Sequence, residues 1–181
     1  AAGAVKRVSG YSRARATDLA GTDVAHADAD EAEGCRRQSV GSAAHQALRL
    51  GVVDQAFDDP AAAVAGADLV LIAVPVGATE SVLKALLPKL SPQALVMDVG
   101  STKRDVVAAA QAALGERVAQ FVPAHPIAGK EAGGIAQAEA SLYQGRCTIL
   151  TPLSVNPVAL VARAQASWEA VGSQVVSMSP Q

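Results

Sequence analysis

The sequence predicts an α/β fold with a doubly wound, mostly parallel β-sheet. Two mostly apolar runs, 68–76 and 94–100, are typical of strands that are buried on both faces of a sheet. Between them, apolar residues recur at helical spacing over 80–90, as expected of a helix that packs on such a sheet. Strand-like and helix-like segments continue to alternate to the end of the chain, which favours repeated strand–helix–strand units.

Turn residues and apolar spacing predict the limits of the remaining elements. A strand should begin at Val5 and end near Tyr11, because a turn-prone Ser-Arg-Ala-Arg segment follows. A short helix over 43–50 should end at Gly51, since glycine is favoured just beyond a helix end. The other expected elements are strands at 120–122, 146–150 and 174–178, and helices at 61–66, 106–114 and 157–171.

Residues 17–42 are expected to form an irregular insert. They are rich in Ala, Asp, Gly and Thr and show no sustained strand or helix period, so they can bury little apolar surface. His26, Asp28, Asp30 and His45 lie within or beside this segment, but their spacing follows no regular pattern of metal ligands. We therefore expect a solvated acidic loop and no metal site.

Composition indicates one globular unit of 181 residues, half of them apolar. The net charge is −2, from 15 basic and 17 acidic residues, and no basic cluster suggests a nucleic-acid partner. The apolar runs are shorter than the ~20 residues of a membrane span, so we expect a soluble protein without a membrane contact. Cys35 and Cys147 form no recognisable pair, which favours a reducing cytoplasm.

The segment 121–131 is the strongest candidate for a functional site. Pro123 and Pro126 cannot donate ladder hydrogen bonds, so the strand should stop there and present His125 on a stiff turn at its carboxyl end. In an open α/β sheet, ligands bind at that end, and an imidazole with an ordinary pKa of ~6.5 can accept a proton there at neutral pH. The alternative is a structural histidine that only hydrogen-bonds the backbone.

Three loops, 74–77, 100–103 and 125–129, follow the carboxyl ends of predicted strands. Parallel strands place such loops along one edge of the sheet, where a nucleotide would lie, so Ser101 and His125 are expected to approach each other. The Ser101 hydroxyl could orient the imidazole or be activated by it as a nucleophile, although no Gly-x-Ser-x-Gly elbow surrounds it. Ser101 could also simply cap the following helix.

Charged residues beside these loops have two interpretations. Lys103 and Arg104, at the start of a helix, are interpreted as ordinary solvated charges. Glu131 could orient a substrate or act as a gate, or it could be an exposed residue that opens the next helix, where a negative charge is favourable.

Four segments, in this order and spacing, resemble the nucleotide-binding domain of the prephenate/arogenate dehydrogenase family. The resemblance extends from Leu48 to the end of the chain and, more loosely, over 1–16. The segments are Asp68-Leu-Val-Leu-Ile-Ala-Val-Pro-Val76, Asp98-Val-Gly-Ser-Thr-Lys103, His125-Pro-Ile-Ala-Gly-Lys-Glu131 and Leu142-Tyr-Gln-Gly-Arg-Cys-Thr-Ile-Leu-Thr-Pro152.

This resemblance implies a Rossmann-like fold and the NAD(P)-dependent oxidative decarboxylation of prephenate to 4-hydroxyphenylpyruvate, a step of tyrosine biosynthesis. By motif, His125 would take the proton of the substrate's ring hydroxyl, Ser101 would hold imidazole and hydroxyl in line near the nicotinamide, and Glu131 would lie close to the substrate entrance. Arogenate is the alternative substrate. The cofactor would contact Ala73, Val74, Pro75, Gly100 and Ser101.

The chain departs from the family pattern at both ends. The first strand and its glycine-rich turn, which binds the pyrophosphate, are not found before Val5, and the helical dimerisation domain of the family does not follow Gln181. Residues 1–181 are therefore predicted to be an incomplete dinucleotide-binding domain, inactive alone and part of a homodimer at full length. A catalytically silent fragment remains an alternative, as does a relative of the β-hydroxyacid dehydrogenases and imine reductases, although His125-Pro-Ile-Ala-Gly129 argues against the latter.

The choice of cofactor depends on the end of the strand that begins at Val5. NAD-selective folds place Asp or Glu there, whereas this chain has Ser12, Arg13 and Arg15, which suit a 2′-phosphate. We therefore expect Ser12 and Arg13 to bind the cofactor and favour NADP over NAD. The alternative is that these arginines are simply solvated.

Overall fold

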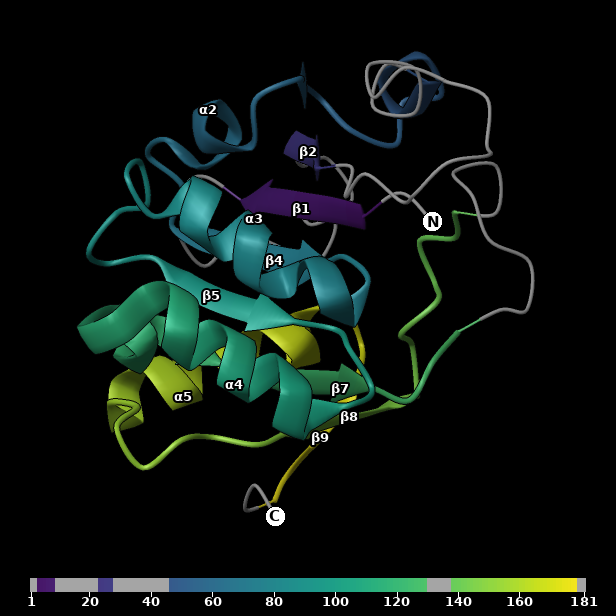
Figure 1. Ribbon diagram of the computed structural model, residues 1–181. Helices are drawn as coiled ribbons and strands as arrows, with labels where there is room; N and C mark the ends of the chain where they lie inside the picture. The colour runs from purple at the N-terminus through teal and green to yellow at the C-terminus, as the bar shows by residue number, and fades with distance from the viewer. Residues whose placement is uncertain (1–2, 9–22, 28–45, 130–137, 179–181) are drawn as a thin grey trace.

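The computed structural model describes residues 3–8, 23–27, 46–129 and 138–178 (Figure 1). A short helical segment, residues 46–49, lies between the second and third strands and ends near Gly51, as the sequence predicts. The strands are β1 (Gly3–Val8), β2 (Asp23–Ala27), β3 (Ala56–Phe57), β4 (Leu69–Ala73), β5 (Leu95–Asp98), β6 (Phe121–Val122), β7 (Ala124–Pro126), β8 (Cys147–Leu150) and β9 (Gln174–Ser177). The helices are α2 (Pro60–Val64), α3 (Thr79–Leu86), α4 (Lys103–Leu114) and α5 (Val158–Ala170), with 3₁₀ turns η2 (Val76–Ala78) and η3 (Gly115–Gln120).

The larger sheet has the strand order β3-β2-β1-β4-β5-β6. β4, β5 and β6 are parallel, and β2 is parallel to β3, which confirms an α/β fold with a parallel sheet. β1, however, is antiparallel to both β2 and β4, and it occupies the position beside β4 that the sequence left without a strand. The lack of the family's first strand and glycine-rich turn stays a prediction. The direction of β1 differs from that of the mostly parallel sheet that we predicted.

β2 corrects the prediction of an irregular insert at 17–42. Asp23–Ala27 forms a strand that pairs with β1 on one side and with β3 on the other. The alternating sequence Asp-Val-Ala-His-Ala provides enough pattern for a strand once neighbours are available on both sides. The rest of the insert lies outside the described residues.

A second sheet, with the order β7-β8-β9, carries the end of the chain. The strands predicted near 146–150 and 174–178 are observed as β8 and β9, which are parallel to each other. β7 is antiparallel to β8, and the described residues form two sheets and not the single doubly wound sheet that we expected. The change of sheet occurs at Pro123, between β6 and β7, where no backbone N–H is available to continue the first ladder.

Two apolar clusters cover the opposite faces of the parallel strands. Because side chains alternate along a strand, Val70 and Ile72 of β4 join one cluster and Leu69 joins the other. The first cluster includes buried residues of α2, α3 and α4, and the second includes Ala164 and Trp168 of α5. Figure 1 shows α3 and α4 in front of the sheet and α5 behind it. This layered arrangement leaves the carboxyl ends of β4 and β5 to the connecting loops.

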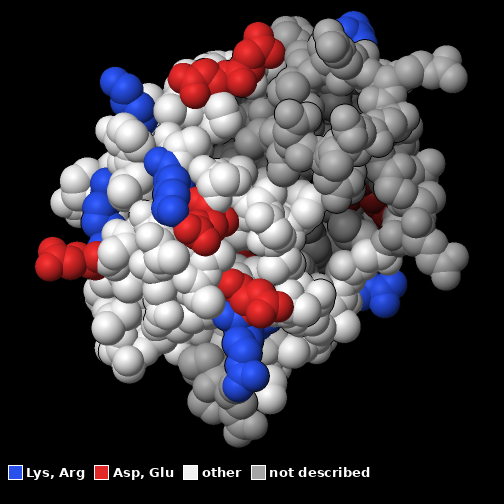
Figure 2. Space-filling model, in the orientation of Figure 1, with Lys and Arg blue, Asp and Glu red and all other residues white. Residues whose placement is uncertain are grey.

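Figure 2 shows how charged side chains are distributed over one face of the molecule. On the face shown in Figure 2, acidic and basic side chains are interspersed among uncharged ones, and the described residues form no large patch of one sign there. Among the parts of the chain that the structure describes, no helix has the length and apolar character needed to cross a membrane.

Candidate functional site

The end of β4 supplies the first loop of the candidate site. Ala73 and Val74 are half-buried, and Pro75 is exposed where the chain turns into η2. The carbonyl of Pro75 accepts a 2.8 Å hydrogen bond from the N–H of Ala78, which closes this turn before α3 begins. All three residues therefore lie at the carboxyl edge of the sheet, as the sequence predicts.

The end of β5 supplies the second loop, which contains Gly100 and Ser101. A Cβ on Gly100 would lie 3.1 Å from Asp98 Oδ2 and 3.2 Å from Val106 Cγ2, so a larger residue does not fit without displacing its neighbours. Ser101 is exposed. It does not cap α4, because the N-cap position is Thr102 and no side chain makes a capping hydrogen bond. The alternative interpretation, in which Ser101 caps the following helix, is therefore wrong.

His125 lies within β7, not on a turn after a strand. Its Cα is paired with that of Ile149 in β8, and its neighbours Ala124 and Pro126 are buried while His125 is half-buried. As we expected, the strand before His125 ends at Pro123, since β6 stops at Val122. Pro126, however, is the last residue of the short strand β7, whose one strand neighbour among the described residues is β8. Within the described part of the chain, no hydrogen bond joins the side chains of His125 and Ser101.

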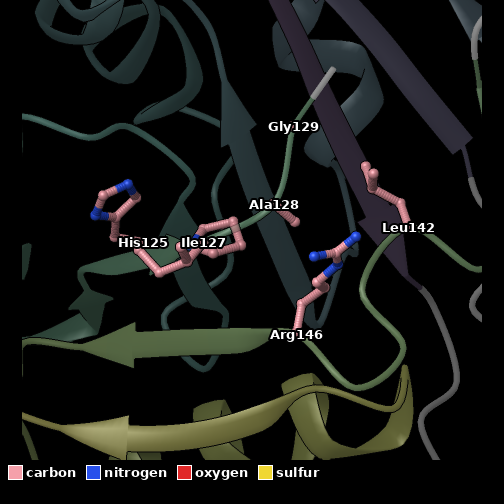
Figure 3. A pocket seen from close by; sticks show the side chains of 7 residues that line it. His125, Ile127, Ala128, Gly129, Leu142 and Arg146 are labelled. Carbon is pink, nitrogen blue, oxygen red and sulfur yellow. The ribbon is translucent and has the colours of Figure 1, made fainter.

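A pocket of about 400 Å³ opens beside His125 (Figure 3). In this view, the imidazole of His125 lies at one end of the lining and points away from the guanidinium of Arg146, which lies between Ala128 and Leu142. The pocket is lined by His125, Pro126, Ile127, Ala128, Gly129, Leu142 and Arg146.

Arg146 is a candidate binding residue that the sequence analysis missed. Its carbonyl accepts hydrogen bonds from Gln174 N at 2.8 Å and Ser173 Oγ at 2.8 Å, so its backbone is held at the start of β8. Among the described residues, none forms an ion pair with its guanidinium. The sequence shows only an arginine directly before an apolar run, and the antiparallel pairing of β7 with β8 is what brings it to the pocket.

Lys103 is not the solvated residue that we expected. Its ammonium group forms an ion pair with Asp98, and the two side chains are only 14% and 3% exposed. Burial lowers the pKa of Lys103, an effect that the charge and hydrogen bond of Asp98 partly oppose. Lys103 Nζ also donates a 2.6 Å hydrogen bond to the carbonyl of Ala124, the residue before His125.

Three of the predicted site residues, Ser12, Arg13 and Glu131, lie outside the described residues. Their roles in cofactor and substrate binding therefore stay predictions. Val8, at the carboxyl end of β1, is paired with Leu69 at the amino end of β4, so β1 ends at the edge opposite to the candidate site.

The sequence was compared with those of known proteins. Residues 35–177 match the family model described as prephenate dehydrogenase, nucleotide-binding domain. A cyclohexadienyl dehydrogenase of Zymomonas mobilis is 36% identical over 170 residues, which are 94% of this chain and 55% of that protein. A prephenate dehydrogenase of Bacillus subtilis is 36% identical over 136 residues, which are 75% of this chain and 36% of that protein.

Solved structures give the same result. Prephenate dehydrogenase from Aquifex aeolicus, in complex with hydroxyphenyl propionate and NAD⁺, superposes with a TM-score of 0.69 at 34% identity, over 76% of this chain and 47% of that one. Synechocystis arogenate dehydrogenase superposes with a TM-score of 0.65 at 28% identity, over 80% of this chain and 49% of that one. The chain thus spans about half the length of these relatives. The family match covers most of its residues, and the chain therefore belongs to the prephenate dehydrogenase family, through the nucleotide-binding domain.

Proposed function

We propose that the complete protein catalyses the oxidative decarboxylation of prephenate to 4-hydroxyphenylpyruvate with NAD⁺ as hydride acceptor. The observation that carries this proposal is the position of His125, which lines a pocket and is tied through Ala124 to the carboxyl end of β5. A proton acceptor at this position would stand between the substrate pocket and the edge of the sheet where nucleotides bind. Family membership supports the same reaction.

The residues at the carboxyl edge fit a nicotinamide cofactor. β4 and β5 are parallel neighbours whose ends lie side by side, and Pro75, Gly77 and Ser101 are exposed in the loops that follow them. When bound, the oxidised cofactor supplies the acceptor for a hydride from the substrate. Support for NAD⁺ comes from the Aquifex complex, which contains NAD⁺.

In this proposal, His125 acts as a general base. The neutral imidazole accepts the proton of the ring hydroxyl while a hydride leaves the carbinol carbon, so that this carbon becomes a carbonyl. Loss of the ring carboxylate as CO₂ then returns its electron pair to the ring, which becomes aromatic, and the carbonyl oxygen is reprotonated. Ser101 would hold the ring hydroxyl and the imidazole in line, and Glu131 would lie at the substrate entrance.

Arg146 extends the proposal to substrate binding. Prephenate carries two carboxylates, and a guanidinium is suited to bind a carboxylate by two parallel hydrogen bonds. The pocket combines this cation with apolar groups of Ile127, Ala128 and Leu142, which suit the substrate's ring. We propose that Arg146 binds one substrate carboxylate while His125 faces the ring hydroxyl.

Arogenate is a second candidate substrate, because the relatives include proteins named cyclohexadienyl dehydrogenase and arogenate dehydrogenase. The two substrates share the ring hydroxyl and the ring carboxylate and differ in the side chain, so the role of His125 is the same for both. The complete protein is further proposed to be a homodimer, as the resemblance implies.

The test is cofactor reduction by the complete protein with prephenate or arogenate and with NAD⁺ or NADP⁺. His125→Asn should lower kcat about 10²- to 10⁴-fold, while cofactor binding is retained. His26→Asn, a substitution in β2, serves as the matched control and should keep full activity. Absence of turnover with either substrate in the unmodified protein would refute the proposed reaction and favour a catalytically silent nucleotide-binding fold.

A further inference from the structure

We propose that Asp98 and Lys103 are positioning residues that fix the backbone of His125 relative to the loop of Ser101. This inference rests on the proposed role of His125, because a positioning residue is defined by the group that it positions. It concerns a buried ion pair between the end of β5 and the start of α4, neither of which lines the pocket.

Asp98 joins the two segments through its two carboxylate oxygens. Oδ1 accepts a 3.0 Å hydrogen bond from the N–H of Ala124, and Oδ2 accepts a 2.9 Å hydrogen bond from the N–H of Gly100. The first contact lies one residue before His125, and the second lies one residue before Ser101. A single side chain therefore sets the spacing between the two segments that carry the proposed catalytic groups.

Lys103 holds the same segment by a second group. Its ammonium donates to Asp98 Oδ2 and, at 2.6 Å, to the carbonyl of Ala124. That carbonyl belongs to the peptide group that links Ala124 to His125. Together, the pair binds both the N–H and the C=O of Ala124, which limits rotation of the backbone on either side of this residue. β7 is therefore hydrogen-bonded to β8 along one edge, and Asp98 and Lys103 hydrogen-bond its first residue, Ala124.

A purely structural clamp would not need charges at this position. Elsewhere in the fold, Asn156 holds the carbonyls of Ala119 and Phe121 with a neutral amide, at 3.0 and 2.9 Å. A buried ion pair contributes little to stability, because the loss of hydration offsets the attraction between the charges. Its contribution here is orientation: a carboxylate and an ammonium make four directed contacts with the two functional segments and with each other.

The experiment uses NMR of the 181-residue chain labelled at alanine, histidine and tryptophan. It records the hydrogen exchange of the Ala124 amide and the chemical shifts of the His125 ring. The variants are Asp98→Asn, Lys103→Met and the double variant. The double variant removes both charges, so that no buried charge is left without its partner. Lys84→Met is the matched control, since Lys84 forms an exposed ion pair with Glu80. The indole signal of buried Trp168 reports whether each variant is folded.

We expect Ala124 to exchange about ten-fold faster or more in the folded variants, and the His125 ring signals to shift, while the control leaves both unchanged. Unchanged Ala124 exchange and unchanged His125 signals in the folded double variant would overturn the proposal. With the complete enzyme, the double variant should lower kcat more than it changes the KM for NAD⁺, because both side chains are largely buried. If the unmodified enzyme shows no turnover, the proposed reaction fails, and the NMR result still decides the positioning role.

Discussion

The carboxylate of Asp98 accepts a hydrogen bond of 3.0 Å from the backbone N–H of Ala124, although 26 positions separate the two residues. This contact crosses from the end of the larger sheet to the first strand of the smaller one. It is the point at which the loop of Ser101 and the strand of His125 are joined, so changes near Asp98 should affect both the fold and the site.

Gly100→Ala should destabilise the protein. The added methyl group would lie 3.1 Å from Asp98 Oδ2 and 3.2 Å from Val106 Cγ2, and we expect a loss of about 1–3 kcal/mol in the free energy of unfolding. Urea denaturation measures this difference. Gly77→Ala is the control, because a methyl group added there would meet no atom within 4 Å. Equal stability of the two variants would contradict the close packing at Gly100.

Arg146→Gln should weaken substrate binding by the complete enzyme. Loss of a charged hydrogen bond to a substrate carboxylate corresponds to about 1.5–3 kcal/mol, so the KM for prephenate should rise about ten-fold or more while the KM for NAD⁺ stays constant. Steady-state kinetics measure both constants. Arg49→Gln, at another exposed arginine, should leave both unchanged. A normal KM for prephenate in Arg146→Gln would remove Arg146 from the substrate site.

The stability of the protein should depend on the ionisation of Lys103. Burial lowers its pKa below the ordinary value of 10.5, so the unfolded chain binds more protons than the folded one between the lowered pKa and 10.5. This contribution to stability is therefore largest above pH 10.5 and is lost as the pH falls through the folded-state pKa. Unfolding free energies of the parent chain and Lys103→Met, compared at neutral and at alkaline pH, should show the parent gaining relative to the variant. A constant difference would contradict the lowered pKa.

Asn156→Ala should destabilise the connection before α5. Asn156 donates to the carbonyls of Ala119 and Phe121 and accepts a 2.7 Å hydrogen bond from the N–H of Leu153. Losing these bonds and leaving two carbonyls without this partner should cost about 2–3 kcal/mol. Thermal and urea denaturation should detect the loss. Gln165→Ala, which removes an exposed contact with Glu169, should change stability by less than about 0.5 kcal/mol.

The elements that the sequence predicts best are those with a clear local pattern of buried apolar residues. The run 68–76 contains β4, and the helix expected at 106–114 is observed as α4, which begins earlier, at Lys103. Both predictions depend on local apolar pattern and on flanking glycine or proline. The direction of β1 could not be predicted in this way, because pairing direction depends on neighbours that are distant in the sequence.

The residues of the candidate site also differ in how well the sequence predicts them. His125 was selected from its flanking prolines, and the structure places it at the pocket. Arg146 and Lys103 were not selected, because an isolated arginine and a lysine in the first turn of a helix usually remain solvated. Their positions depend on the β7–β8 pairing and on the burial of Asp98, which are tertiary features.

The junction at Pro123 also affects the order in which the protein can assemble during synthesis. Within the described chain, β7 has a single strand neighbour, β8, and Ala124 is paired with Leu150, so the strand of His125 must wait for a partner made later by the ribosome. β4 and β5, in contrast, are adjacent and parallel and are complete before His125 is added. The nascent chain can therefore form its nucleotide edge first, and the residue proposed to perform the chemistry acquires its final environment among the last.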